Sequence, residues 1–331
     1  MPELPEVESV RVGVHEWTAG TTITGAEVID PRILGTTSQR RIDASAVDGF
    51  IAAVTGRRII AAERRGKFMW LTLGEDLGAG PAAEPAAPEL SLLVHLGMSG
   101  QLRVHDAADE IHRHTRAILR LERGSESLQL RFIDQRIFGH LGVQPLVHAY
   151  GRLVPASANH IAADPLEPAF EPGLALEQLA RKRTVVKSAL LDQSLVSGIG
   201  NIYADEALFR AGIHPLAIPA RTRKSRLAAV LDSATRVMSD ALAVGGTSFD
   251  ALYVNVNGES GYFYIDVERV EGSRALERRD WQCWTAARRQ RVVSQSDQAR
   301  RALAKQLDGP TRSAAHRRSS GPRTLRGVAC A

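Results

Sequence analysis

The spacing of apolar positions changes along the chain and predicts two kinds of secondary structure. Near the start, Val7, Val10, Val14 and Trp17 recur at intervals of 3, 4 and 3, which predicts an amphipathic helix beginning at Pro5. The following β-branched or alternating segments predict mostly antiparallel strands in a sandwich or barrel. These segments are 21–30, 57–73, 90–105, 113–122 and 126–139.

From about residue 166 the pattern becomes helical. Helices are expected within 171–182, 187–196, 201–212 and 223–244, and Gly212 is expected to close the third of them. The predicted fold class is therefore α+β, with an N-terminal helix and an antiparallel β-sandwich domain followed by a helical domain. The expected divisions are a first domain at 1–146, a linker at 147–165, a helical domain at 166–263 with a glycine-rich loop at 245–263, and an atypical Arg/Ala-rich, partly disordered tail at 264–331.

Charge is distributed unevenly between the tail and the rest of the chain. A net charge of +5 and a pI near 9.5 are typical of nucleic-acid binding. However, residues 265–331 carry 15 Lys/Arg against 7 Asp/Glu, so the tail contributes +8 and the remainder −3. A polyanion site outside the tail must therefore rest on local basic clusters. The sequence contains no apolar run of membrane-spanning length and no secretory signal, which favours a cytoplasmic protein without a membrane partner.

The opening MPELPE offers reactive chemistry as well as a helix start. Removal of Met1 would leave Pro2 as a secondary amine with a pKa of roughly 8, against about 10.4 for lysine. Such an amine can condense with an aldehyde-level carbon to give an iminium, which acts as an electron sink for elimination. Glu3 and Glu6 are placed to transfer protons beside it. The alternative is that the segment is only a capped helix.

Six motifs in order decide between these readings of the N-terminus. They are MPELPEVE at the start, RRGKF at 64–68, HLGMSGQLR at 95–103, DQRIFG at 134–139, SGIGNIYADEALFRAGIHP at 197–215, and GGTSF to GYF within 245–263. Together they resemble the bacterial formamidopyrimidine-DNA glycosylases, the Fpg/Nei family of base-excision repair, over residues 1–263. The resemblance implies a monomeric, nucleoid-associated bifunctional DNA glycosylase and AP lyase. Its expected partner is double-stranded DNA containing oxidised bases, such as 8-oxoguanine and formamidopyrimidines, or abasic sites.

The resemblance also assigns residues to roles. It implies that Pro2 is the nucleophile, Glu3 the proton donor to the sugar, Glu6 a supporting acid, and Lys67 a phosphate contact that assists elimination. A helix–two-turn–helix and the loop 245–263 would hold the DNA and cover the flipped base. The implied DNA contacts are His112, Arg136, Arg183, Lys187 and Asn201; the void-filling set is Met98, Arg136 and Phe138; and Glu206 supports the active site. From the residues alone, Asn201 also fits a helix N-cap, and the N–H groups of Gly198 and Gly200 fit a phosphate site.

The C-terminal tail departs from the family pattern. Familiar members end in a zinc finger with two Cys-x-x-Cys pairs, whereas this chain has only Cys283 and Cys330. Two distant cysteines cannot supply a four-thiolate site, so no zinc and no other cofactor is expected. The hypotheses for the tail are a translational frameshift and a finger that needs no zinc.

Two alternative functions stay open at this point. An endonuclease VIII-like enzyme would prefer oxidised pyrimidines, although that branch usually has glycine where Leu4 stands. A damaged-DNA-binding protein with impaired catalysis would follow if loss of the finger disables turnover. Duplexes containing 8-oxoguanine or thymine glycol, together with borohydride trapping, separate these alternatives from the leading prediction.

Overall fold

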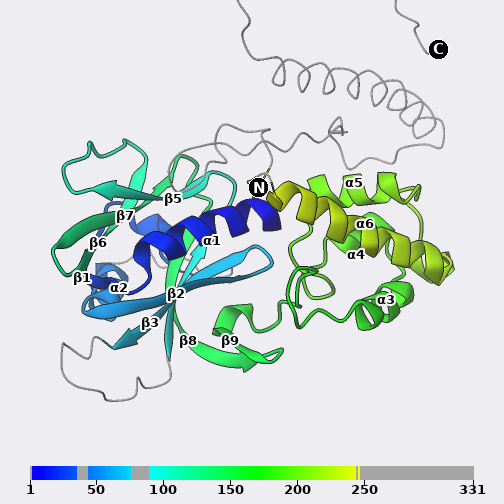
Figure 1. The fold of residues 1–331 in the computed structure, drawn as a ribbon, viewed down its shortest axis with the longest axis horizontal. Coiled ribbons are helices and arrows are strands. Elements are labelled where there is room, and N and C mark those ends of the chain that lie inside the picture. Colours follow the sequence, from blue (N-terminus) through cyan, green and yellow to red (C-terminus); the bar gives the residue numbers. More distant parts are fainter. Residues whose placement is uncertain (1, 36–43, 76–88, 244, 247–331) are drawn as a thin grey trace, which may run out of the picture. The chain divides into compact units, whose positions relative to one another are not determined.

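The predicted opening helix is present as α1, Leu4–Thr18, in the computed structural model, which describes residues 2–35, 44–75, 89–243 and 245–246 (Figure 1). Val7, Val10 and Val14 are buried, as their spacing predicts. Trp17 is not part of this buried face, because 42% of it is exposed. Thr18 takes the inward position instead and satisfies its hydroxyl by donating to the carbonyl of Val14 at 2.7 Å.

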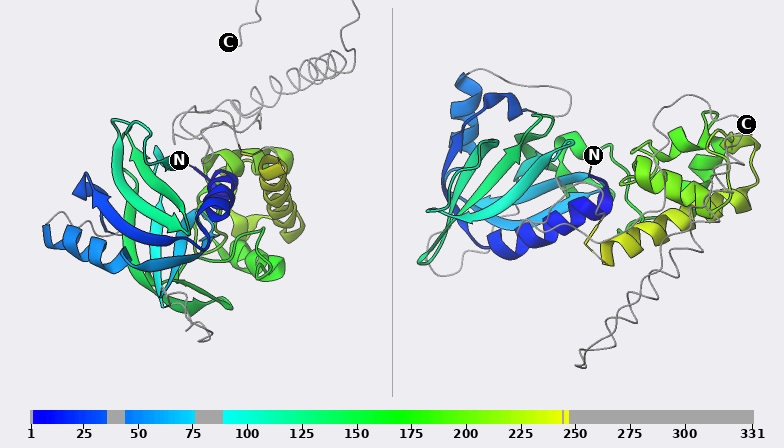
Figure 2. Two further views of the ribbon diagram at one scale, coloured as in Figure 1. Left: turned by 60° about the vertical axis from the view of Figure 1, so that its left-hand side comes forward. Right: turned by 90° about the horizontal axis from the view of Figure 1, so that it is seen from above.

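The strands form one antiparallel sheet in the order β5-β7-β6-β1-β2-β3-β4-β8-β9. Apolar side chains from β3, β4 and β8 face those from β5, β6 and β7 across a shared core, so the sheet closes into the predicted sandwich (Figure 2). The bounds are β1 Thr22–Val28, β2 Arg57–Arg65, β3 Phe68–Glu75, β4 Leu90–His95, β5 Gly100–Asp106, β6 Thr115–Arg123, β7 Glu126–Asp134, β8 His140–Ala149 and β9 Arg152–Pro155.

Two features of this domain differ from the sequence prediction. A helix that was not predicted, α2, spans Ala44–Val54 and packs Phe50 and Val54 into the sandwich core. The strand pattern also does not stop at residue 146, because β8 continues to Ala149 and pairs with β9 around a turn at Tyr150 and Gly151. Both residues of that turn have positive φ, which allows the tight reversal. Part of the predicted linker is therefore a hairpin.

The second half of the described chain is helical, as predicted. The helices are α3 Pro172–Arg181, α4 Val186–Leu190, α5 Asn201–Arg210 and α6 Lys224–Ala243, and the short 3-10 turns are η1 Pro31–Ile33, η2 Ala156–Ala158 and η3 Pro219–Arg221. The predicted helix at 187–196 is shorter than expected, since α4 ends at Leu190. Gly212, at φ +64°, follows the end of α5 as predicted.

Helix α1 belongs to two hydrophobic cores at once. Val7, Val10 and Val14 pack into the sandwich core, whereas Leu4 packs into the core formed by α3 to α6. The helix contacts β2 on one side and α6 on the other (Figure 2). All described residues fall within one unit, Met1–Val267, and none of their helices is long and apolar enough to cross a membrane. The N-terminus is thus fixed at the junction of the sandwich and the helices.

Candidate active site

Glu3 caps the N-terminus of a helix almost two hundred residues away. Its carboxylate accepts hydrogen bonds from the backbone N–H groups of Gly200 at 2.6 Å, Ile202 at 2.8 Å and Tyr203 at 3.3 Å. These donors belong to the first turn of α5, whose N–H groups have no partner within the helix. Gly200 is required here, because a side-chain Cβ at that position would overlap the Glu3 carboxyl group.

Glu6 holds the start of α1 from the other side. One of its oxygens accepts from the backbone N–H of Glu3 at 2.9 Å, and the other accepts from the Tyr203 hydroxyl at 2.8 Å. Both carboxylates are nearly inaccessible to solvent, with 3% of Glu3 and 6% of Glu6 exposed. Two acidic side chains at the start of α1 are therefore fixed by hydrogen bonds to α5.

Lys67 lies beside this pair of carboxylates. It lies in the turn between β2 and β3, is 7% exposed, and donates from Nζ to the carbonyl of Ile199 at 2.8 Å. Pro2 is buried next to Glu3 at the start of the chain. The structure thus brings together all four residues predicted for catalysis: Pro2, Glu3, Glu6 and Lys67.

Burial shifts the proton affinities at this site. Burial raises the pKa of Glu3 to about 7, with the nearby Lys67 charge opposing the shift and the Glu6 charge adding to it. Burial also lowers the pKa of Lys67, while the charges of Glu3 and Glu6 act in the opposite direction. The pKa of the Tyr203 hydroxyl is raised by burial and by Glu6, which keeps it protonated as a donor. A carboxyl group with a pKa near neutrality can both donate and accept a proton.

The predicted void-filling residues lie on two loops held together by one buried aspartate. Met98, in the turn between β4 and β5, is 39% exposed, and Phe138, after β7, is 51% exposed. Asp134 is fully buried between the loops. It accepts from the Ser99 hydroxyl at 2.5 Å and from the Gly139 N–H at 2.7 Å. Two large apolar side chains therefore project from loops that are themselves fixed.

Arg136 lies on the same loop as Phe138 and is also exposed. Its backbone N–H donates to Asp134 at 3.1 Å, which fixes the loop while leaving the guanidinium outside. Ile137, between the two, adopts a φ of +57°, which L-residues rarely occupy, and packs against the sandwich core. This turned-in isoleucine leaves Arg136 and Phe138 facing solvent on either side.

The remaining predicted DNA contacts are spread over other surfaces. His112 is exposed in the segment before β6, and its ring lies 5.4 Å from that of His114. Arg183 is exposed between α3 and α4. Lys187, on α4, forms an ion pair with Asp205 of α5 at 2.8 Å.

The start of α5 differs from the sequence prediction at its N-cap. Asn201 is the first residue of the helix and is exposed; Gly200 holds the N-cap position, and Glu3 supplies the cap. The N–H groups proposed for phosphate are donated within the chain, since Gly198 N–H bonds to Gln193 at 2.9 Å and Gly200 N–H bonds to Glu3. The glycines instead allow α1 to approach closely.

Glu206 and the loop at 245–263 complete the set of predicted positions. Glu206, on α5, is 3% exposed and accepts from Arg210 at 3.0 Å. Only Gly245 and Gly246 of the loop are described, and Gly246 lies beside Glu6. The rest of the loop and the whole tail lie outside the described residues. Within the described residues, no group of three or more His, Cys, Asp or Glu is arranged to hold a metal ion.

Several residues that build this site were not singled out from the sequence. Tyr203 and Asp134 both lie inside motifs that were recognised, NIYADE and DQRIFG, but a tyrosine on a helix and an aspartate at a strand end carry no distinctive spacing. Asp164, which contacts the turn before Lys67, lies where no motif was recognised. Only the fold shows that these three side chains support the predicted ones.

Family models match both halves of the described chain. The N-terminal domain of formamidopyrimidine-DNA glycosylase matches residues 1–141, and the helix–two-turn–helix domain of the same enzyme matches residues 161–252. These two domains, with paired carboxylates and a lysine at their junction, define a two-domain DNA glycosylase of the helix–two-turn–helix class.

Relatives narrow this class to one family. The formamidopyrimidine-DNA glycosylase of Nocardia farcinica is 47% identical over 263 residues, covering 80% of this chain and 85% of the relative. That of Rhodococcus jostii is 46% identical over 297 residues, covering 89% and 93%. A solved Lactococcus lactis Fpg in complex with DNA containing an abasic site is similar with a TM-score of 0.61 and 25% identity, over 78% of this chain and 84% of that one. The chain belongs to the formamidopyrimidine-DNA glycosylase family.

Proposed function

We propose that this chain excises oxidised purines from double-stranded DNA and then cleaves the strand through a Schiff base on Pro2. The observation that carries the proposal is the buried carboxyl group of Glu3, which is adjacent in the chain to Pro2 and whose pKa burial raises to about 7. The relatives are named formamidopyrimidine-DNA glycosylases, which favours this function over the oxidised-pyrimidine and non-catalytic alternatives. A similar solved structure is that of a Lactococcus lactis Fpg mutant in complex with DNA containing Fapy-dG.

The first step requires a free amine at Pro2. While Met1 is attached, the Pro2 nitrogen is an amide and is not nucleophilic; removal of Met1 makes it a secondary amine. The amine attacks C1′ of the damaged nucleotide, the bond to the base breaks, and the base leaves with the electron pair of that bond; the proton lost from the attacking nitrogen neutralises the departing base. Protonation of the ring oxygen by Glu3 opens the sugar and leaves the C1′–N bond as an iminium.

Strand cleavage then proceeds by elimination. The iminium accepts electrons when a proton is lost from C2′, and the C3′–O bond breaks so that the 3′ phosphate leaves. A second elimination breaks the C5′–O bond and releases the 5′ phosphate. Lys67, buried beside Glu3 and tethered to the Ile199 carbonyl, is proposed to contact the phosphate next to the lesion and assist these steps. Binding DNA would exchange the Ile199 contact for a charge-assisted bond to phosphate.

Lesion exposure is proposed to depend on the two loops joined at Asp134. Extruding a base costs a few kcal/mol of stacking and pairing, and inserted apolar side chains compensate for that loss. Phe138 is proposed to enter the stack and Met98 the vacated space, since both are large and already exposed. Arg136 is proposed to bond to the orphaned base, and Arg183, Lys187, Asn201 and His112 to contact the backbone.

Borohydride trapping tests the proposed function. The processed chain, with Met1 removal verified by mass spectrometry, is incubated with a duplex containing 8-oxoguanine opposite cytosine in the presence of borohydride. A covalent adduct whose DNA-bearing peptide begins at Pro2 is expected, together with a much weaker adduct on a thymine glycol duplex. Pro2→Gly keeps an N-terminal amine after processing and controls for the secondary amine. Absence of an adduct with processed protein refutes the function.

We also propose that no zinc takes part. Four thiolates form the structural zinc site of family members, whereas this sequence has two cysteines and no Cys-x-x-Cys pair. The residues therefore do not fit the metal, and no step above is routed through it. Because the proposed substrate lies in chromosomal DNA, we expect the protein to be located at the bacterial nucleoid. The location of a fluorescent fusion tests this expectation.

A further inference from the structure

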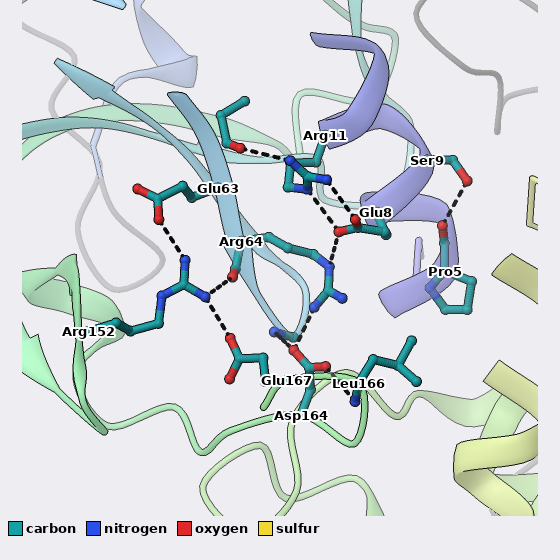
Figure 3. Close-up of polar contacts among 12 residues, drawn as sticks. Pro5, Glu8, Ser9, Arg11, Glu63, Arg64, Arg152, Asp164, Leu166 and Glu167 are labelled. Carbon is teal, nitrogen blue, oxygen red and sulfur yellow. Dashed lines mark hydrogen bonds and ion pairs between the residues drawn. The ribbon is translucent and has the colours of Figure 1, made fainter. Parts of the chain in front are cut away.

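A buried arginine connects the helix of Pro2 with the turn of Lys67. Arg64, near the end of β2, is 8% exposed and donates from Nε to Glu8 on α1 at 2.6 Å (Figure 3). Its Nη1 donates to Asp164 at 2.5 Å. Glu8 also receives two hydrogen bonds from Arg11, at 2.9 and 2.8 Å, so its orientation is fixed from both sides.

Asp164 is fully buried and its carboxylate receives donors from three directions. Besides Arg64, the backbone N–H of Leu166 donates to it at 3.1 Å (Figure 3). The backbone N–H of Gly66 donates to it at 3.0 Å. Burying a carboxylate without such partners costs several kcal/mol of folding free energy, so these donors hold Asp164 in place. A substitution that weakens their hydrogen bonds is expected to let the segments that carry them shift. Asp164 thus ties the segment after β9 to the turn between β2 and β3.

The same turn is held on its opposite side by the segment leading into α5. Gly66 has a φ of +55°, and a Cβ there would lie 2.7 Å from Ser197 Cβ and 2.8 Å from the Gly198 nitrogen. The turn therefore has no room to move towards α5 and is bonded to Asp164 on its other side. Lys67 comes next in the chain and donates to Ile199, just beyond that segment.

We propose that Asp164 is a positioning residue for catalysis. Through Gly66 it fixes the turn that presents Lys67, and through Arg64 and Glu8 it sets that turn relative to α1 and its N-terminal Pro2. The inference rests on the proposed function, because it assumes that Pro2 and Lys67 act together. Asp164 itself contacts neither DNA nor the reacting atoms; it acts through Pro2 and Lys67.

Weakening the contacts of the Asp164 carboxylate is expected to slow strand cleavage much more than it weakens DNA binding. Asp164→Asn keeps the size of the side chain but loses the charge that pairs with Arg64. A displacement of about 1 Å at a reacting group reduces rates by on the order of 10²-fold. We therefore expect single-turnover cleavage of an abasic-site duplex to fall about 10- to 100-fold. The Kd for a duplex with a tetrahydrofuran abasic analogue should stay within about threefold of wild type, because only the proposed Lys67 phosphate contact is affected and the other proposed DNA contacts are unchanged.

Coupling to Lys67 separates positioning from a merely structural role. In the Lys67→Ala background, Asp164→Asn should cause little further loss of cleavage rate, because the placement of Lys67 relative to Pro2 no longer matters once the Lys67 amine is absent. Asp164→Glu, which keeps the charge, should recover most of the activity. Glu27→Gln is the control for loss of one carboxylate–arginine pair: Glu27, on β1, accepts from Arg120 on β6 at 3.0 Å, and both residues lie outside the turn and α1. Its cleavage rate should equal that of the wild type.

The outcomes separate the two proposals. If wild-type protein forms no borohydride adduct, the proposed function fails and this inference fails with it. Only the positioning role is overturned if the wild type is active and the Asp164→Asn variant, shown to be folded, cleaves at the wild-type rate. The same holds if Asp164→Asn lowers the cleavage rate by the same factor with and without Lys67. Should Asp164→Asn not fold, Glu8→Gln breaks the other end of the Arg64 bridge. A drop of about threefold or more in adduct formation supports the role, and an unchanged rate overturns it.

Discussion

Replacing Glu3 by glutamine is expected to change how stability depends on pH. The native pKa of Glu3 is about 7, raised from 4.5 chiefly by burial. The folded protein holds the Glu3 proton more tightly than the unfolded chain does. Protonated Glu3 therefore contributes its full share to the free energy of unfolding below pH 4.5, and this contribution is lost as the pH rises through 7. A shift of this size corresponds to about 3 kcal/mol. Glu3→Gln removes the ionisation and hence this pH-dependent loss.

Urea unfolding of wild type and Glu3→Gln, followed by circular dichroism from pH 4.5 to 8, measures the difference. The free energy of unfolding of Glu3→Gln minus that of wild type should rise by up to about 3 kcal/mol over this range, mostly between pH 5 and 7. The change should be largest in protein that retains Met1. Removal of Met1 leaves an ammonium group on Pro2, which favours the charged form of Glu3 and so opposes the rise in its pKa. Glu27→Gln, on the exposed side of β1, controls for loss of one carboxylate. A difference that stays constant across the range refutes the buried-acid account.

Three further changes have definite expected outcomes. Gly200→Ala should displace the Glu3 carboxyl group and reduce single-turnover excision of 8-oxoguanine by about 10²-fold or more; Gly173→Ala, which meets no atom within 4 Å, should excise normally, and equal rates for the two would contradict the close-approach argument. Tyr203→Phe should lower the free energy of unfolding by about 1–3 kcal/mol, because Glu6 loses a buried donor; a loss well below this in urea titrations would show that another group takes over. Incubation with a zinc chelator should leave cleavage unchanged and elemental analysis should find less than one zinc per chain; stoichiometric zinc would disprove the zinc-free proposal.

The fold class followed from the sequence because periodicity reports burial directly. The sandwich, the helical domain and α6 were predicted from apolar spacing, and Val7, Val10 and Val14 are buried accordingly. Trp17 was not, because a large ring at the end of a helix remains partly exposed while Thr18 fills the inward position. Helix α2 was missed because ASAVDGFIAAV, rich in alanine and β-branched residues, gives no clear preference between helix and strand.

The site was predicted only where a motif names residues. Pro2, Glu3, Glu6 and Lys67 lie in two short motifs, and the fold brings them together. The groups that hold these residues in place could not be predicted in the same way. The donors to Glu3, for example, are backbone N–H groups, which no side-chain pattern reveals. Asp164 likewise derives its importance from Gly66, which is 98 positions away in the chain. Contacts of this kind depend on tertiary structure, so the sequence could indicate the reactive groups but not what holds them.

The long reach of Glu3 has a consequence for how the protein is made. The contacts between Glu3 and Gly200, Ile202 and Tyr203 span 197 to 200 positions. At about 5–20 residues per second, these partners emerge from the ribosome on the order of 10–40 s after the N-terminus. Pro2 is buried in the folded chain, so the proposed removal of Met1 would have this interval, while the terminus is still undocked. If Pro2 is the nucleophile, as proposed, its amine is therefore expected to be released before the domain that encloses it folds.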